Sequence, residues 1–236
     1  VANAFVSDGL QKGQAKLAQD ESKNQILIAH GHVQQEHHLK IVSPDNLIEL
    51  PEGNVGEIWF AGPSLARGYW NDDEKTKASF GAKLPDDENS YLRTGDLGFI
   101  YQGELYISGR IKDVMIIKGR NYYPQDMEKL AYQVYPGLNQ NGAAAFEYNG
   151  NAVLLLEVNR QEMAEFDFNQ ASETIKSAIF DQFEVVLADV LFVKAGRINR
   201  TPSGKITHPG PGHQRQKQHV RRAISSDPVP RRRARR

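Results

Sequence analysis

The sequence predicts an α+β protein, with a first half made mainly of strands and a second half that mixes helices with strands. In the first half, short apolar stretches are separated by Gly, Pro and Asn, which is typical of short antiparallel strands. Apolar side chains at helical spacing occur in residues 124–134 and again in residues 169–183. Between these segments, Asn149-Gly150 joins two apolar runs and gives the strongest hairpin signal in the chain.

The first half is expected to open with 33 loosely structured residues, in which short apolar pieces at AFV and ILIA lie among polar residues. The stretches LKIV, LIEL and EIWFAG then predict three short strands, because turn-forming residues separate them. A short helix is predicted from Asn71, since NDDEKTKASF places a capping side chain and acids at the positive end of the helix dipole. The strands YLR, GFIY and ELYIS follow between residues 91 and 108.

The second half predicts one compact α+β domain of roughly 100 residues. VMII predicts a short buried strand, and Pro124 suits the first turn of the helix that follows it. AAAFEY and AVLLLEV are the strands of the Asn149-Gly150 hairpin, a helix covers about residues 169–183, and VLFV is the last strand. The predicted order is therefore strand, helix, hairpin, helix, strand.

The formal net charge of zero conceals a division of the chain. Residues 1–206 carry 20 basic and 28 acidic side chains, whereas residues 207–236 carry 9 basic and 1 acidic. The last segment has too few apolar side chains to offset chain entropy, so we predict a disordered basic tail. Its RRRARR end would attract phosphates, which leaves a nucleic-acid tether open, although an extension unrelated to the rest of the chain is the simpler explanation.

Composition also excludes several classes of protein. Without cysteine there is no disulfide or thiolate site, and a reducing, cytoplasmic setting fits. No apolar run approaches the ~18 residues needed to span a bilayer. The start, VANAFVSDGLQKG, has neither a Met nor the basic flank and apolar core of a signal peptide, so we expect it to lie inside a longer protein.

Three motifs in order resemble the adenylate-forming acyl ligases, the superfamily that includes acyl-CoA synthetases. They are GEIWFAGPSLARGYWN, YLRTGDLGFIYQGELYISGRIKDVMIIKGRNYYPQDME and NRTPSGKI, and together they look most like the fatty acyl-AMP ligases. The resemblance covers about residues 1–206. It implies that residues 1–109 end the AMP-binding domain, with a family-specific extra segment over about 1–33 and a β-subdomain over about 34–109. Residues 110–206 would be the small mobile C-terminal domain, followed by the tail 207–236.

The resemblance implies an enzyme that uses ATP and Mg²⁺ to activate a fatty acid as acyl-AMP and then transfers the acyl group to an acyl carrier protein. Coenzyme A is the alternative acceptor, as in an acyl-CoA synthetase. The phosphate loop and the adenine-packing segment of these ligases do not occur in this sequence, so we expect a C-terminal portion that is inactive alone. A non-catalytic fragment or adaptor, binding a carrier protein or, through its tail, nucleic acid, is the competing class.

Within TGDLGF, the resemblance assigns a nucleotide site. Asp96 matches the carboxylate that accepts hydrogen bonds from both ribose hydroxyls, which one acid can do with its two oxygens. Gly95 and Gly98 are expected to leave room for the nucleotide. Taken alone, Thr94-Gly95-Asp96 would be only a polar turn, but its place between YLR and GELYISGR favours the nucleotide role.

Three basic residues complete the assignment. Arg110 matches an arginine that contacts the ribose or phosphate side of the nucleotide, and its alternative is a surface ion pair with Asp113 or Glu104. Lys112 occupies the position where the superfamily places the hinge of its small domain. Lys205 in NRTPSGKI matches the catalytic lysine that stabilises charge on the phosphoryl oxygens, and its alternative is a solvated turn lysine.

Four histidines lie close together in the sequence, at His30, His32, His37 and His38. Their spacing does not follow an established ligand pattern, and no cysteine assists them, so no metal site is predicted. Trp70 is expected to pack against the β-subdomain rather than to stack on a ligand.

Overall fold

The computed structural model describes residues 1–19 and 23–198. They form an α+β fold that divides into two compact units, with the boundary between Lys112 and Asp113. Arg110, where the second domain was predicted to begin, therefore lies in the first unit. Lys205 and the predicted tail, residues 207–236, lie outside the described residues.

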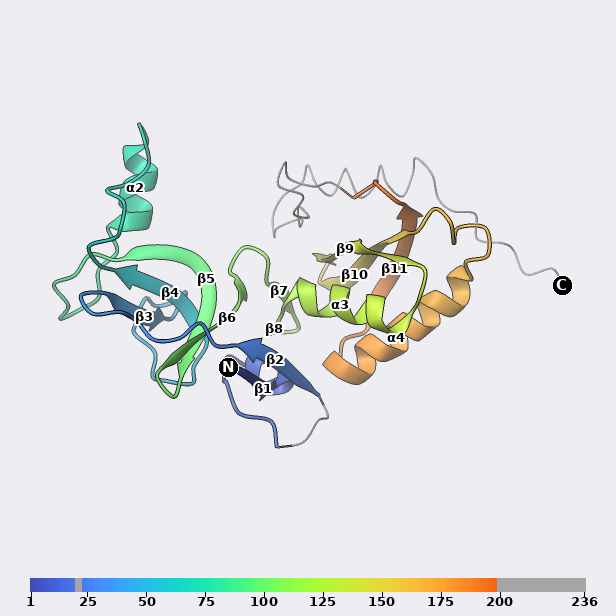
Figure 1. Ribbon diagram of the computed structural model, residues 1–236, viewed down its shortest axis with the longest axis horizontal. Coiled ribbons are helices and arrows are strands. Elements are labelled where there is room, and N and C mark those ends of the chain that lie inside the picture. The colour runs from blue at the N-terminus through green and yellow to red at the C-terminus, as the bar shows by residue number, and fades with distance from the viewer. Residues whose placement is uncertain (20–22, 199–236) are drawn as a thin grey trace. The chain divides into compact units, whose positions relative to one another are not determined.

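The first unit is built on a four-stranded antiparallel sheet in which neighbouring strands follow one another in the sequence (Figure 1). Its strands are β3 (His38–Val42), β4 (Gly56–Ala61), β5 (Leu92–Tyr101) and β6 (Glu104–Arg110). The predicted short helix is confirmed as α2 (Asp73–Phe80), where the Asp72 side chain accepts a hydrogen bond from the Lys75 backbone N–H at 2.9 Å. The predicted strands YLR and GFIY are one continuous strand, β5.

The N-terminal segment is structured, so the expectation of 33 loosely structured residues is wrong. It contains β1 (Ala2–Val6), α1 (Ser7–Gln11) and β2 (Asn24–Ile28), and β1 pairs with β2 in antiparallel fashion. The Phe5 side chain is fully buried, and its ring meets those of Phe99 and Tyr106 edge-on at 4.9 and 5.1 Å between centroids. An aromatic anchor from β1 thus fixes this segment on the β5–β6 hairpin.

Two further expectations for the first unit are wrong. The stretch LIEL forms no strand and contributes only a bridge between Val42 and Glu49, because Leu47 takes a positive φ of 57° that interrupts the extended chain. Trp70 does not pack against the sheet, since 91% of its surface is exposed. The preceding residue, Tyr69, instead meets Phe80 of the neighbouring helix α2, with ring centroids 5.5 Å apart.

The second unit has a three-stranded sheet in the order β11-β10-β9 and two helices. The strands are β9 (Leu138–Tyr148), β10 (Asn151–Val158) and β11 (Leu187–Lys194), and the helices are α3 (Pro124–Val134) and α4 (Phe168–Phe183). A small hairpin, β7 (Met115–Ile117) and β8 (Arg120–Tyr122), precedes them. The predicted order is confirmed, although β8 was not expected.

Both faces of the second sheet are buried, which explains why AVLLLEV is apolar throughout. Helices α3 and α4 lie along one face of this sheet (Figure 1). On this face, Leu154 and Leu156 pack in one cluster with residues of both helices, such as Met127 of α3. On the other face, Val153 and Leu155 form a smaller cluster that includes Ile198. Ile198, shortly after β11, therefore packs on the face that the helices leave open.

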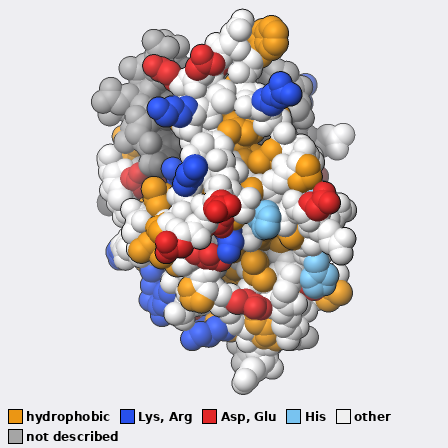
Figure 2. Space-filling model, turned by 90° about the vertical axis from the view of Figure 1, so that its left-hand side faces the viewer, with side chains coloured by type: hydrophobic (Ala, Val, Ile, Leu, Met, Phe, Trp, Pro, Cys, Tyr) orange, Lys and Arg blue, Asp and Glu red, His pale blue; other side chains and the backbone are white. Residues whose placement is uncertain are grey.

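Charges of both signs are mixed on the face of the first unit that Figure 2 shows, with apolar side chains between them. An extended positive patch would favour nucleic-acid binding. The described residues of this face do not form one. Within the described part of the chain, no helix combines the length and apolar character needed to cross a membrane.

Candidate nucleotide-binding site

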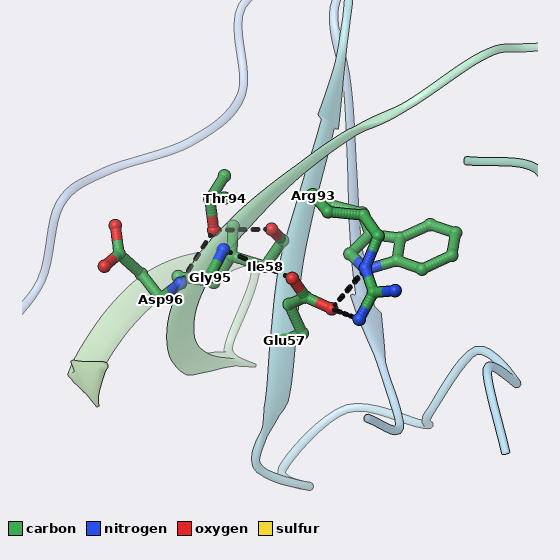
Figure 3. Close-up of polar contacts among 7 residues, drawn as sticks. Glu57, Ile58, Arg93, Thr94, Gly95 and Asp96 are labelled. Carbon is green, nitrogen blue, oxygen red and sulfur yellow. Dashed lines mark hydrogen bonds and ion pairs between the residues drawn. The ribbon is translucent and has the colours of Figure 1, made fainter. Parts of the chain in front are cut away.

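Thr94, Gly95 and Asp96 form a kink within β5, close to where the pairing of β4 with β5 changes register. The Thr94 hydroxyl donates to the Ile58 carbonyl oxygen at 2.7 Å and accepts from the Asp96 backbone N–H at 3.1 Å (Figure 3). One hydroxyl therefore ties the kink to β4 and also fixes the backbone of Asp96.

The kink is also held by Glu57, a residue of β4 that is only 2% exposed. Its Oε2 accepts from Trp59 Nε1 at 3.0 Å and from Arg93 Nε and Nη2 at 3.0 and 2.8 Å, while Oε1 accepts from the Gly95 backbone N–H at 3.2 Å. Figure 3 shows the Glu57 carboxylate between Arg93 and Gly95, with the Asp96 carboxylate directed away from it. The buried acid thus connects the sheet to the backbone that presents Asp96.

Glu57 and Arg93 were not predicted as site residues. The signal in the sequence was a single acid in the apolar strand GEIWFA. A carboxylate buried in such a strand needs hydrogen-bond or ion-pair partners. The partner Arg93 lies directly before Thr94, and its Cα faces that of Trp59 across the β4–β5 pair.

Asp96 and Arg110, both predicted to contact the nucleotide, are paired with each other. They lie opposite one another across β5 and β6, and Arg110 Nε is 2.9 Å from Asp96 Oδ1. The predicted alternative partners, Asp113 and Glu104, are not the ones found. The two side chains are 67% and 30% exposed for Arg110 and Asp96, so the pair contributes about 0–1 kcal/mol and gives way readily to another ligand.

Gly95 and Gly98 are explained by different structural constraints. Gly95 has φ +72°, a conformation that strains any other residue, and a Cβ placed there would meet no atom within 4 Å. A Cβ at Gly98 would collide with the Tyr106 carbonyl oxygen and with the Ile58 side chain. Gly98 is therefore explained by packing inside the sheet, whereas Gly95 combines a left-handed backbone with open space where a Cβ would lie.

The chain leaves this site directly at the unit boundary. The Ile111 backbone N–H donates to the Gly95 carbonyl oxygen at 2.9 Å, and Lys112, the predicted hinge, is the last residue of the first unit. The structure thus brings together Gly95, Asp96 and Arg110 and places Lys112 two residues after Arg110. Their roles toward a nucleotide stay predictions.

Burial raises the pKa of Tyr91, Asp126 and Tyr135, which all lie outside the kink. Burial, reinforced by its hydrogen bond to Asp87, raises the pKa of Tyr91 to about 12, and the Tyr91 hydroxyl donates to Asp87 Oδ2 at 2.7 Å. In α3, burial raises the pKa of Asp126 to about 7, with Lys129 opposing the shift. The Tyr91–Asp87 hydrogen bond thus links two residues of the loop before β5. The raised pKa of Asp126 places the titration of this carboxyl group near neutral pH.

The clustered histidines make contacts typical of structural side chains. His32 Nδ1 lies 2.9 Å from the Gly103 carbonyl oxygen, and His37 Nε2 lies 2.9 Å from the Ser64 hydroxyl. The His37 ring also stacks on Phe60 at 5.3 Å between centroids. Within residues 1–19 and 23–198, no three His, Asp or Glu side chains gather as metal ligands.

Known proteins match this chain over most of its length. A family model described as the AMP domain of Disco-interacting protein 2-like proteins matches residues 112–209. The medium-chain-fatty-acid–[acyl-carrier-protein] ligase JamA of Moorena producens (strain JHB) is 45% identical over 171 residues, which are 70% of this chain and 29% of JamA. The long-chain-fatty-acid–AMP ligase FadD26 of Mycobacterium tuberculosis (strain CDC 1551 / Oshkosh) is 36% identical over 212 residues, 86% of this chain and 36% of FadD26. The chain is a homologue of the fatty acyl-AMP ligases.

Solved structures agree with this relationship to fatty acyl-AMP ligases. A structure from studies of fatty acyl-adenylate ligases of E. coli and L. pneumophila has a TM-score of 0.75 and 28% identity, and the match covers 96% of this chain and 38% of that one. An adenylation-domain structure from a keto acid-selecting NRPS module has a TM-score of 0.69 and 27% identity, covering 87% of this chain and 17% of that one. The chain spans about a third of the length of the curated relatives it matches.

Proposed function

We propose that this chain forms part of an ATP-dependent ligase that activates a fatty acid as acyl-AMP and transfers the acyl group to an acyl carrier protein. The observation that carries the proposal is the hydrogen-bonded kink at Gly95, which presents the partly exposed Asp96 carboxylate beside Arg110. JamA, the relative at 45% identity, is named for ligation of medium-chain fatty acids to acyl-carrier-protein. An adaptor would need neither a left-handed glycine nor a buried acid that holds the backbone next to Asp96.

In the adenylation step, an oxygen of the fatty acid carboxylate attacks the α-phosphorus of ATP, and the bond to the leaving pyrophosphate breaks. Asp96 accepts hydrogen bonds from the ribose hydroxyls, and Arg110 donates to oxygens of the ribose or phosphate. Arg110 engages one oxygen of Asp96, so the second oxygen can accept without loss of the ion pair. Lys205 stabilises the charge that accumulates on the phosphoryl oxygens.

Mg²⁺ accompanies ATP in this proposal and neutralises phosphate charge. Among the described residues, no cluster of three acidic or histidine side chains forms a cage for it. The metal is therefore assigned to the phosphates and to the phosphate-binding region, which this sequence does not contain, and no residue of the chain is given a role as its ligand.

Lys112 is proposed as the hinge between two catalytic conformations of the second unit. Two independent observations support a boundary there, because the second unit begins at Asp113 and the matched family model begins at residue 112. A residue at the edge of two compact bodies can absorb a backbone change without disturbing either core. The domains are accordingly proposed as residues 1–112, ending the AMP-binding domain, and a mobile domain from Asp113 to about residue 206.

Coenzyme A is the competing acceptor. It is favoured by relatives named putative fatty-acid–CoA ligase FadD21, at 36% identity for the Mycobacterium bovis protein, but the 45% identity to JamA favours a carrier protein. The two acceptors are distinguished by supplying a ligase with preformed acyl-AMP and measuring thioester formation on each.

The adenylation assignment is tested in a ligase assembled from this chain and the N-terminal region of a fatty acyl-AMP ligase. Lys205→Ala should slow fatty-acid-dependent ATP–pyrophosphate exchange by about 100- to 1,000-fold, because a preorganised charge is lost where transition-state charge develops. Transfer from preformed acyl-AMP should change far less. Exchange within a few-fold of the parent ligase would assign Lys205 to a solvated turn instead.

A further inference from the structure

Glu157 is a fully buried acid near the end of the apolar strand β10. It follows Val153 and Leu155 at a spacing of two, so it lies on the sheet face that the helices leave open. Its Oε2 accepts from Asn139 Nδ2 at 2.8 Å, and its Oε1 accepts from the Ile198 backbone N–H at 2.8 Å. A valine would suit the sheet equally well, so the acid calls for a separate explanation.

The backbone around Glu157 accommodates a carboxylate. The β9–β10 pairing shifts register between Leu156 and Val158, opposite the start of β9. At Gly142, in that part of β9, a Cβ would lie 2.5 Å from Glu157 Oε2 and 2.6 Å from Glu157 Cβ. Any side chain at Gly142 would therefore displace Glu157. The register shift, the missing Cβ and the Asn139 amide together form a site for this carboxylate.

What the carboxylate holds is the chain that leaves β11. The Ile198 side chain is 7% exposed and packs in the cluster of Val153 and Leu155, so the residue is fixed by an apolar contact as well as by its backbone N–H. Hydrogen bonds to charged acceptors are roughly twice as strong as neutral ones, and they are directional, which apolar contacts are not. Glu157 thus determines where Ile198 lies and in which direction its N–H points.

We propose that Glu157 is a positioning residue for Lys205, acting by anchoring the start of the segment that carries it. Lys205 follows Ile198 by seven residues in the sequence, and seven extended residues span at most about 25 Å. Fixing one end of so short a segment restricts where the ammonium group can lie and lowers the entropy lost when it reaches the nucleotide. This inference rests on the proposed adenylation function, in which Lys205 is the catalytic lysine.

The first arm of the test uses the 236-residue chain itself. Glu157→Leu keeps the approximate shape of the side chain but removes both acceptors, and amide hydrogen exchange should then accelerate at Ile198 by at least about tenfold. Glu128→Leu is the matched control, because Glu128 is also buried and accepts from the Ala145 backbone N–H at 2.8 Å in the same unit. The control should leave exchange at Ile198 unchanged. Equal acceleration in both variants would show general loosening and overturn the anchor.

The second arm measures both half-reactions in the assembled ligase. Glu157→Leu should slow pyrophosphate exchange by at least about tenfold and leave transfer from preformed acyl-AMP within about threefold of the parent. Glu157→Gln should recover most of the exchange, because its amide oxygen still accepts from the Ile198 N–H. If Glu157→Leu does not fold, Ile198→Pro removes the donor instead and should give the same selective loss.

The outcomes separate the inference from the function on which it rests. Parental exchange in Glu157→Leu, with a defective Lys205→Ala, would overturn positioning by Glu157 and leave the adenylation function intact. Equal loss in both half-reactions, matched by Glu128→Leu, would overturn it too, since it would show a structural role only. If Lys205→Ala itself retained exchange, the catalytic assignment would fail, and the inference would fail with it.

Discussion

Arg93→Ala should destabilise the first unit far more than loss of a surface ion pair. The substitution removes two of the three hydrogen bonds that Glu57 Oε2 accepts, from Arg93 Nε at 3.0 Å and Nη2 at 2.8 Å. It leaves a carboxylate that is 2% exposed without a positive partner among these hydrogen bonds. The guanidinium also lies 5.7 Å from the centroid of the Trp59 ring, and truncation to alanine removes this cation–π interaction as well.

The magnitude follows from the exposure of the two partners. Breaking a fully buried ion pair by removing one side costs about 3–5 kcal/mol. The Arg93 side chain is 35% exposed, so water screens part of the interaction and can enter after truncation. We therefore expect a loss of about 2–3 kcal/mol in the free energy of unfolding. Glu57→Gln combined with Arg93→Ala should be less damaging than Arg93→Ala alone, because the buried charge is then removed together with its partner.

Urea unfolding followed by tryptophan fluorescence measures this directly. Both tryptophans of the chain lie in the first unit, and Trp70→Phe removes the exposed one, so the signal comes from Trp59, which is 1% exposed. Lys40→Ala is the matched control, since the Lys40–Glu49 pair has the same kind of contact at 2.9 Å, but the Glu49 side chain is 48% exposed whereas that of Glu57 is 3% exposed. It should cost about 1 kcal/mol or less. If Arg93→Ala cost no more than the control, the Glu57 network would not be what holds the kink.

Three further predictions concern the site and the second unit. Asp96→Asn in the assembled ligase should weaken both half-reactions by about tenfold or more, seen as a raised KM for ATP, because the amide cannot accept from both ribose hydroxyls. Lys112→Pro should slow acyl transfer more than pyrophosphate exchange, because a fixed φ hinders rotation at the proposed hinge. Asp126 has a pKa raised from 3.8 to about 7, so its contribution to stability is present below pH 3.8 and is lost as the pH rises through about 7. Asp126→Asn should therefore flatten that decline in thermal melts, whereas an unchanged pH profile would contradict it.

The sequence predicted those elements whose signals are local. Helical spacing predicted α3 and α4, and the Asn149-Gly150 turn predicted the β9–β10 hairpin, because each pattern depends on residues close in the chain. The structure of the N-terminal segment depends instead on Phe5 meeting Phe99 and Tyr106, which lie far along the chain. No local pattern indicates such a contact, so the segment was expected to be loose.

The same distinction explains the result for the candidate site. Motif resemblance identified Asp96 and Arg110, and the structure brings them to 2.9 Å, but resemblance could not indicate that they pair with each other. Nor did it identify Glu57, which fixes Gly95 from a neighbouring strand. A single acid in GEIWFA and another in AVLLLEV were visible in the sequence. Reading them required a rule about burial rather than a motif, namely that a charge in an apolar strand must have partners.

Glu57 and Glu157 have the same structural role in the two units, because each holds a segment of backbone in place. Each is a buried acid in an apolar strand, and each accepts a backbone N–H, from Gly95 in one case and Ile198 in the other. A loop cannot be fixed by apolar packing alone, because that force has no direction, whereas a charged acceptor fixes both the distance and the direction of the N–H. The cost of burying each carboxylate is offset locally by its donors. Each acid therefore fixes the backbone near a proposed site residue, at Gly95 next to Asp96 and at Ile198 seven residues before Lys205.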